Sequence, residues 1–218
     1  MGTANVYLLM LAILWLAYFA IHSILASLWL KQKIAAWRPA VMPAYRAVYN
    51  LAALIFLIPP LWMTVSFSGS WLWRWQGPWF WISNTLALLA IAGFLWSLRY
   101  YDGQEFLGLR QWRLKQESVL DQERFHVSPL HRFVRHPWYF LGLVILWTRD
   151  MNAAWLVTIS FATLYFILGS RLEEAKLLRY HGKTYRRYRE QVPGLLPLPW
   201  RFLSKKAALE IEMESDRN

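Results

Sequence analysis

The chain has no cysteine among its 218 residues, so disulfides, thiolate metal sites and a cysteine nucleophile are excluded. Acidic residues are also few: 13 Asp and Glu stand against 24 Lys and Arg, which gives a formal net charge of +11. The sequence has no glycine-rich phosphate-binding motif and no His-Glu-x-x-His or other tight metal-ligand spacing. It also lacks any alternation of strands and helices, which excludes a Rossmann-type domain.

Apolar residues, by contrast, are abundant. They make up 57% of the chain, and 15 of the residues are Trp, which favours membrane–water interfaces. Three apolar stretches, at about 5–30, 45–67 and 79–101, approach the roughly 20 residues needed to cross a bilayer. The first is too long and has too little basic charge before it for a signal peptide, so we expect a retained span. Pro59-Pro60 should kink or end the regular helix of the second.

The second half of the chain predicts a helical hairpin. An apolar stretch at 138–147, short for a full span, and a longer one at 153–169 flank a polar turn. From Arg171 the sequence predicts an amphipathic tail helix that Gly182 breaks or bends and that ends near Val192-Pro193. We therefore expect an all-α polytopic membrane protein with about five transmembrane helices.

The distribution of charge predicts the topology. Except for Arg74 and Arg149, every Lys and Arg falls in the three segments that five crossings place on one side of the membrane. Because cytoplasmic loops are rich in Lys and Arg, we expect the N-terminus outside and the C-terminus in the cytoplasm, as in a bacterial inner-membrane protein. Topology thus explains the charge without a nucleic-acid partner. The predicted parts are three spans (1–101), a cytoplasmic amphipathic connector (102–135), the hairpin and tail (136–204) and a charged, frayed end (205–218).

A basic motif opens the hairpin, with the sequence Arg135-His136-Pro137-Trp138-Tyr139. Pro is pre-organised for the first turn of a helix, so Arg135 and His136 should lie just before a helix N-terminus, where an anion is favoured. At the far end of the hairpin, Glu173 and Glu174 repel one another and need cationic partners, with Arg171, Lys176 and Arg135 as candidates. The alternatives are an ordinary membrane boundary for the motif and a solvated helix face for the glutamates.

Two further groups are weaker candidates for a site. His22 lies within the first span, and Arg46 and Tyr49 open the second, so these residues are candidates to line a substrate cavity. A helix–helix hydrogen bond and interfacial anchoring are the alternatives. His181 and Tyr185 belong to the tail helix, which we expect either to cover the site or to lie on anionic lipid.

Taken together, the C-terminal motifs resemble those of the isoprenylcysteine carboxyl methyltransferase superfamily. Three other segments, His22-Ser23-Ile24-Leu25-Ala26-Ser27, Tyr45-Arg46-x-x-Tyr49 and Trp147-Thr148-Arg149-Asp150-Met151, more narrowly resemble the bacterial methanethiol S-methyltransferase-like and NnrU-like membrane proteins. Two features differ from the pattern: Ser128-Pro129-Leu130 replaces a common Gly-Pro-Tyr, and Gly142 stands one residue late. The matching elements, from about residue 134 to 199, are Arg135-His136-Pro137-x-Tyr139, Arg171-x-Glu173-Glu174-x-x-Leu177, His181-Gly182-x-x-Tyr185-x-x-Tyr188 and Val192-Pro193.

The resemblance implies a membrane methyltransferase that uses S-adenosyl-L-methionine. Arg171 and Glu174 would align the substrate, a hydrophobic or small-molecule acceptor with a thiol or carboxyl group. The cofactor would be bound from the cytoplasm by residues carried over from the motif: Arg135, His136, Tyr139, Glu173, Glu174, His181 and Tyr185. His136 or a glutamate is the candidate base.

Other functions are compatible with the same residues. A redox-linked, NnrU-like protein would bind haem or quinone, although His22 has no partner histidine at its depth in the membrane. A basic scaffold would use the tail to bind anionic lipid. The sequence predicts the lipid bilayer as a partner and no metal site, and it does not indicate the oligomeric state.

Overall fold

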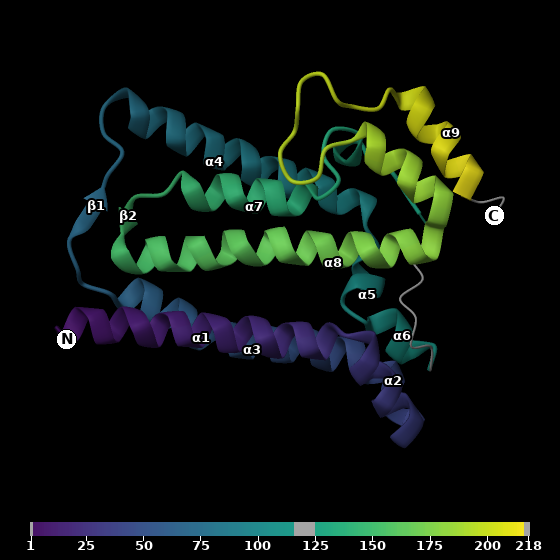
Figure 1. The fold of residues 1–218 in the computed structure, drawn as a ribbon, viewed down its shortest axis with the longest axis horizontal. Coiled ribbons are helices and arrows are strands. Elements are labelled where there is room, and N and C mark those ends of the chain that lie inside the picture. Colours follow the sequence, from purple (N-terminus) through teal and green to yellow (C-terminus); the bar gives the residue numbers. More distant parts are fainter. Residues whose placement is uncertain (1, 116–124, 216–218) are drawn as a thin grey trace. The chain divides into compact units, whose positions relative to one another are not determined.

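The computed structural model describes residues 2–115 and 125–215. Residues 116–124 of the predicted connector and the last three residues of the predicted frayed end lie outside the described residues. The chain forms two compact units, which are described separately below (Figure 1). The long helix α8 (Ala153–Gln191) contributes its residues up to Ala162 to the first unit and the rest to the second.

The first unit is built on two long apolar helices, α1 (Thr3–Ala26) and α3 (Met42–Ser66). Between them lie α2 (Leu28–Trp37) and a 3₁₀ turn at Pro39–Val41. The unit also contains two short helices, α5 (Gly103–Phe106) and α6 (Leu109–Arg113). An antiparallel pair of short strands, β1 (Trp71–Trp73) and β2 (Met151–Asn152), completes it.

The second unit contains α4 (Pro78–Ser97), α7 (Pro137–Trp147), the rest of α8 and α9 (Lys205–Ser215). The unit also contains two 3₁₀ turns, Leu98–Tyr100 and Leu130–Arg132. The Trp138 indole N–H donates to Ser97 Oγ at 2.8 Å, and Arg149 Nη1 donates to Asn84 Oδ1 at 3.1 Å. The two ends of α7 therefore meet opposite ends of α4, so these helices run antiparallel.

The structure confirms an all-α polytopic membrane protein. Within the described residues, four helical segments are long and apolar enough to cross a membrane, namely Thr3–Ala26, Pro39–Ser66, Pro78–Tyr100 and Ala153–Gln191. The shorter apolar helix α7 forms the predicted hairpin with α8, because Trp147 Nε1 donates to Thr163 Oγ1 at 3.1 Å and Tyr139 stacks on Phe166. The direction in which the chain crosses the membrane stays a prediction.

One helix boundary differs from the sequence-based expectation, and the two prolines of the second span do not end its helix. The first span ends at Ala26 rather than near residue 30, because Ser27 adopts an extended backbone and its Oγ accepts a hydrogen bond from Leu30 N–H. Ser27 thus caps the start of α2. In α3 the helix continues through Pro59 and Pro60 to Ser66 instead of ending there. Pro removes N–H donors but keeps its carbonyl, and the Pro60 carbonyl accepts from the Thr64 hydroxyl at 2.8 Å.

The C-terminal part also differs from expectation. Gly182 has φ 48° and ψ −118° and kinks α8, as its sequence predicts. Residues Lys205–Ser215, however, form α9 rather than a frayed end. Ala208 and Ile211 of α9 are buried in a cluster with Tyr185 and Tyr188, so apolar packing orders a segment that its charges alone did not predict.

A chain of buried hydrogen bonds fixes the first unit. The Trp15 indole donates to Thr158 Oγ1 at 2.9 Å, and the Thr158 and Thr64 hydroxyls lie 2.6 Å apart. Because Thr64 donates to the Pro60 carbonyl, Thr158 must donate to Thr64. Each polar group in this chain therefore has a partner, which a buried polar group requires.

Thr158→Val should lower the free energy of unfolding by about 1–3 kcal/mol, because it leaves the buried Trp15 N–H without an acceptor. Thermal unfolding of the detergent-solubilised protein measures this loss. Ser160→Ala, on an exposed position of the same helix, is the matched control and should change little. Equal melting of the two variants would contradict the role of the chain of hydrogen bonds.

Candidate functional site

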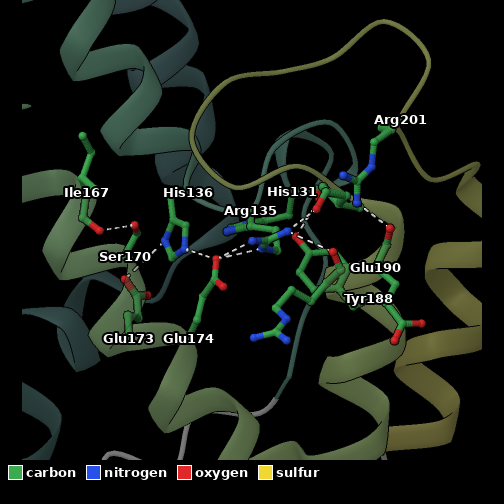
Figure 2. Close-up of polar contacts among 12 residues, drawn as sticks. His131, Arg135, His136, Ile167, Ser170, Glu173, Glu174, Tyr188, Glu190 and Arg201 are labelled. Carbon is green, nitrogen blue, oxygen red and sulfur yellow. Dashed lines mark hydrogen bonds and ion pairs between the residues drawn. The ribbon is translucent and has the colours of Figure 1, made fainter.

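The centre of the site is an ion pair between Arg135, two residues before α7, and Glu174, in the middle of α8. Arg135 Nε and Nη2 both approach Oε1 of Glu174, at 2.8 and 2.7 Å (Figure 2). Both side chains are largely buried, with 12% and 13% of their surfaces exposed. The pair confirms that a cation from the basic motif meets the glutamate pair, one of the three cationic partners that the sequence suggested.

The remaining donors of Arg135 bind backbone carbonyls. Nη1 donates to the carbonyls of Arg189 and Val192, near the end of α8. Four of the five guanidinium N–H groups are therefore used by the protein itself. This side chain holds the site together and has little capacity left for a bound anion.

The backbone of the motif is also tied to the tail. Arg135 N–H donates to the Pro193 carbonyl at 2.8 Å, and His136 N–H donates to the Gly194 carbonyl at 3.1 Å. Gly194 lies so close that an added Cβ would come within 3.3 Å of Arg135 Nη2. The chain after α8 thus closes directly on the start of α7.

His136 lies between the two glutamates. Its Nε2 is 3.1 Å from Glu174 Oε1, and its Nδ1 is 3.4 Å from Glu173 Oε2. Burial acts to lower the pKa of His136, but the hydrogen bonds and charges of the two carboxylates outweigh it and raise the pKa above its ordinary value of 6.5. The two carboxylates therefore favour the protonated imidazolium, whose two N–H groups would each face a carboxylate oxygen.

Tyr139 forms one wall of the site. Its ring stacks on His136, at 5.4 Å and 8° between planes, and on Phe166, at 4.8 Å and 2°. Its hydroxyl donates to Glu173 Oε2 at 3.3 Å. This places a phenol and an imidazole on the same oxygen of Glu173.

Among the described residues, each glutamate has one carboxylate oxygen without a partner. The contacts of Glu174 are made by Oε1, and those of Glu173 are made by Oε2. Glu173 is half exposed, with 50% of its side chain accessible. The site thus presents two carboxylate oxygens that can accept hydrogen bonds from a ligand.

Sequence reasoning missed His131. Its Nδ1 lies 2.8 Å from the Ser128 hydroxyl, and its carbonyl accepts from the Tyr188 hydroxyl at 2.7 Å (Figure 2). Burial lowers the pKa of His131 to about 4, so the ring is neutral at physiological pH. Ser128 and His131 are three residues apart, and this spacing was the available signal for the local hydrogen bond between them.

The tail residues lie beside the site. Tyr185 is 1% exposed, and its hydroxyl is buried with no hydrogen-bond partner among the described residues. Its ring packs with Phe125 and Tyr188. His181 contacts Phe125 at 5.3 Å and is partly exposed. An unpaired buried hydroxyl is uncommon and calls for a partner such as a ligand or water.

The other predicted residues are placed differently. Arg171 is exposed on α8 and, among the described residues, forms no ion pair with either glutamate. In the first unit, the Tyr49 hydroxyl lies 2.7 Å from His22 Nε2, which joins α3 to α1 by the helix–helix hydrogen bond considered as an alternative. Arg46 packs on Gly108, because a Cβ added at Gly108 would lie 2.8 Å from the Cβ of Arg46. A substrate-lining role for these three stays a prediction.

Among the described residues, no group of three or more His, Asp or Glu side chains could hold a metal ion. The candidate site instead combines one guanidinium, one imidazolium and two carboxylates. Such a set suits a ligand that carries both donors and a positive charge.

Comparison with known proteins identifies relatives over most of the chain. It is 32% identical over 202 residues to the methanethiol S-methyltransferase of Pseudomonas deceptionensis, which covers 87% of this chain and 72% of that protein. It is also 32% identical over 199 residues to the methanethiol S-methyltransferase of Mycobacterium tuberculosis, at 85% and 77% coverage. A shorter match to that of Crocosphaera subtropica, 36% over 105 residues, spans 47% of this chain and 40% of the relative. No family model and no solved structure matches.

Arg135→Gln should lower the free energy of unfolding by about 1.5–3 kcal/mol, because it removes the guanidinium partner of the largely buried Glu174 carboxylate. Glu174→Gln should also destabilise, and the double variant should lose less than the sum of the two. Chemical unfolding of all four proteins measures the coupling. Arg186→Gln, at an exposed position of the same tail, is the control, and a coupling near zero would exclude the ion pair as the tie.

His136 should make stability depend on pH. Its folded pKa lies above the unfolded value of 6.5, so its contribution is fully present below about pH 6.5 and is lost as the pH rises through the folded pKa. The melting temperatures of wild type and His136→Gln should therefore differ most in mild acid and converge above neutrality. A difference that stays constant from about pH 6 to about pH 9 would show that the imidazolium is not held by the glutamates.

Proposed function

The chain belongs to the methanethiol S-methyltransferase family, and from this we propose that it is a membrane methyltransferase that uses S-adenosyl-L-methionine to methylate a small thiol. The two glutamate oxygens that have no partner among the described residues, next to Tyr139 and His136, carry the proposal. A thiol is the first acceptor to test because the relatives are methanethiol S-methyltransferases. A prenylcysteine carboxylate and a lipid amine are the other acceptors to compare.

The residues present fit this cofactor. Its ammonium and ribose hydroxyl groups are hydrogen-bond donors. Glu173 and Glu174 each have a carboxylate oxygen that has no partner among the described residues and can accept from them. The buried Tyr185 hydroxyl, which has no partner among the described residues, offers a further polar contact. When bound, S-adenosyl-L-methionine supplies the electrophilic methyl group on its sulfonium.

The roles follow from these contacts. Glu173, Glu174, Tyr139 and His136 would hold the cofactor, with Tyr185 and His181 from the tail. Arg135 is a positioning residue, since its donors already bind Glu174 and two carbonyls.

Arg171 would align the acceptor, because it is exposed two residues before Glu173. The reaction itself needs mainly correct placement, since an in-line methyl transfer gains most from holding the reactants together.

The state of His136 bears on the acid–base chemistry. A thiol must lose its proton to attack, since the thiolate is the nucleophile. The two carboxylates raise the pKa of His136 and so favour its protonated form, which has no lone pair to accept the thiol proton. We therefore propose that the thiol proton leaves to solvent or to a glutamate, and that His136 serves to orient the carboxylates.

We also propose that the site faces the cytoplasm of a bacterial inner membrane. This orientation places Arg135 and Glu174 at the side where the Lys and Arg residues gather. A redox-linked function with haem or quinone is not favoured, since the relatives are named methanethiol S-methyltransferases.

Glu173→Gln should weaken the binding of S-adenosylhomocysteine by about 10–100-fold, the loss expected for one hydrogen bond to a charged group. It should change stability little because Glu173 is half exposed. Calorimetry on the detergent-purified protein measures the affinity. Formation of dimethyl sulfide from methanethiol and S-adenosyl-L-methionine measures the transfer.

The controls separate binding from folding. Glu210→Gln, at an exposed position on α9, should bind and react like wild type. Glu174→Ala should lose both binding and stability because it also removes the partner of Arg135. Folded wild type that binds neither S-adenosyl-L-methionine nor its demethylated product would refute the proposed function.

A further inference from the structure

The segment between α8 and α9 forms a loop. Both ends of this loop are hydrogen-bonded to residues 132–136, which precede α7. At one end the carbonyls of Pro193 and Gly194 accept from Arg135 N–H and His136 N–H. At the other, Leu203 N–H donates to the Arg132 carbonyl at 2.9 Å, and Arg132 Nε donates back to the Leu203 carbonyl at 3.0 Å. The loop, which precedes α9 in Figure 1, is therefore held at its base by four hydrogen bonds.

The tip of this loop is a tight turn. Arg201 N–H donates to the Leu198 carbonyl at 3.0 Å, which closes a four-residue turn with Pro199 in its second position. Pro favours that position because its φ is already set. The Arg201 guanidinium also donates to the Glu190 carbonyl, which ties the turn to the end of α8 (Figure 2). Trp200 stands at the tip of the turn.

Large apolar side chains project from this held loop. Trp200 is 75% exposed, Leu196 62% and Phe202 52%. Phe202 stacks on Phe133, itself 44% exposed, at 5.8 Å and 23° between planes. Because the turn is fixed, these side chains cannot fold back to hide from water, and such exposed apolar patches mark interaction surfaces.

Basic residues surround the apolar side chains. Arg132 lies over the Phe133 ring at 5.5 Å, and Lys205 and Lys206 follow the loop on exposed positions of α9. Aromatic and aliphatic side chains rimmed by Lys and Arg are the pattern of segments that enter the interface of an anionic bilayer. These positive charges attract anionic lipid headgroups. They would repel a second copy of this chain, whose formal net charge is +11.

The level of the loop within its unit supports the same partner. Its base is hydrogen-bonded to Arg135 and His136, directly before the apolar helix α7 begins at Pro137. At that end of α7, Trp138 bonds Ser97, where α4 finishes. The loop therefore leaves the protein at the end of two apolar helices, where the hydrocarbon gives way to headgroups.

We propose that the loop of residues 195–202 inserts Leu196, Trp200 and Phe202 into the interfacial layer of the bilayer. The occupant is the lipid surface, with anionic headgroups paired to Arg132, Lys205 and Lys206. Because the loop base carries the carbonyls that bind Arg135 and His136, this anchor links the candidate site to the membrane surface. The proposal does not depend on the reaction catalysed.

The absence of cysteine makes the test direct, since any introduced cysteine is the only labelled one. Trp200→Cys, Phe202→Cys and Leu196→Cys are labelled in separate full-length proteins with an environment-sensitive nitrobenzoxadiazole probe. Each is reconstituted in vesicles of phosphatidylcholine with phosphatidylglycerol. We expect a blue-shifted emission, and loss of most of it when nitroxide is placed at a shallow acyl position of the lipids.

Arg186→Cys, on an exposed tail position, is the matched control and should be quenched by aqueous iodide instead. Loop probes that behave like this control in both anionic and zwitterionic vesicles would overturn the proposal. Energy transfer between labelled copies without nitroxide quenching would assign the loop to self-association and also overturn it. Agreement among the three loop positions guards against one variant that misfolds.

Discussion

The second unit depends on the ion pair and the hydrogen bonds that the Arg135 guanidinium forms. The guanidinium neutralises Glu174 and, through Nη1, gathers the carbonyls of Arg189 and Val192. One side chain thus joins the start of α7 to both the middle and the end of α8. Arg suits this task better than Lys, because its planar fork presents several donors in fixed directions. The same contacts decide which oxygens of the site are left for a ligand.

The kink at Gly182 makes this closure possible. A continuous helix from Ala153 to Gln191 would carry Arg189 far from Glu174, since each residue adds about 1.5 Å along the axis. The positive φ at Gly182 turns the chain, so that Val192 and Pro193 return to the basic motif. Gly194 then admits the close approach, because a side chain there would press on the guanidinium. Gly182 and Gly194 therefore allow the return of the chain to the basic motif, and Arg135 stabilises it.

Much of this arrangement could be predicted from the sequence, because long apolar runs and a Pro-initiated helix are local signals. Topology then brought the basic motif to the glutamate pair. The detailed pairing could not be predicted: Arg135 rather than the nearer Arg171 meets Glu174, since the partner is set by where the tail returns. Residues of α9 order for a similar reason, through burial of Ile211 against the tail. Such contacts depend on distant packing, which periodicity does not encode.

The balance of charge in the site bears on the proposed chemistry. Two carboxylates face one guanidinium and one imidazolium, so the set is close to neutral as long as His136 stays protonated. A sulfonium loses its positive charge as the methyl group moves, and a strongly negative site would stabilise the reactant more than the transition state. Among the described residues, each glutamate is paired through only one oxygen, so in the proposed function the other oxygen would accept a hydrogen bond from the cofactor. Arg135 and an imidazolium at His136 would balance the negative charge of the two carboxylates. The ion pair that stabilises the tail would thereby also limit the electrostatic cost of the proposed methyl transfer.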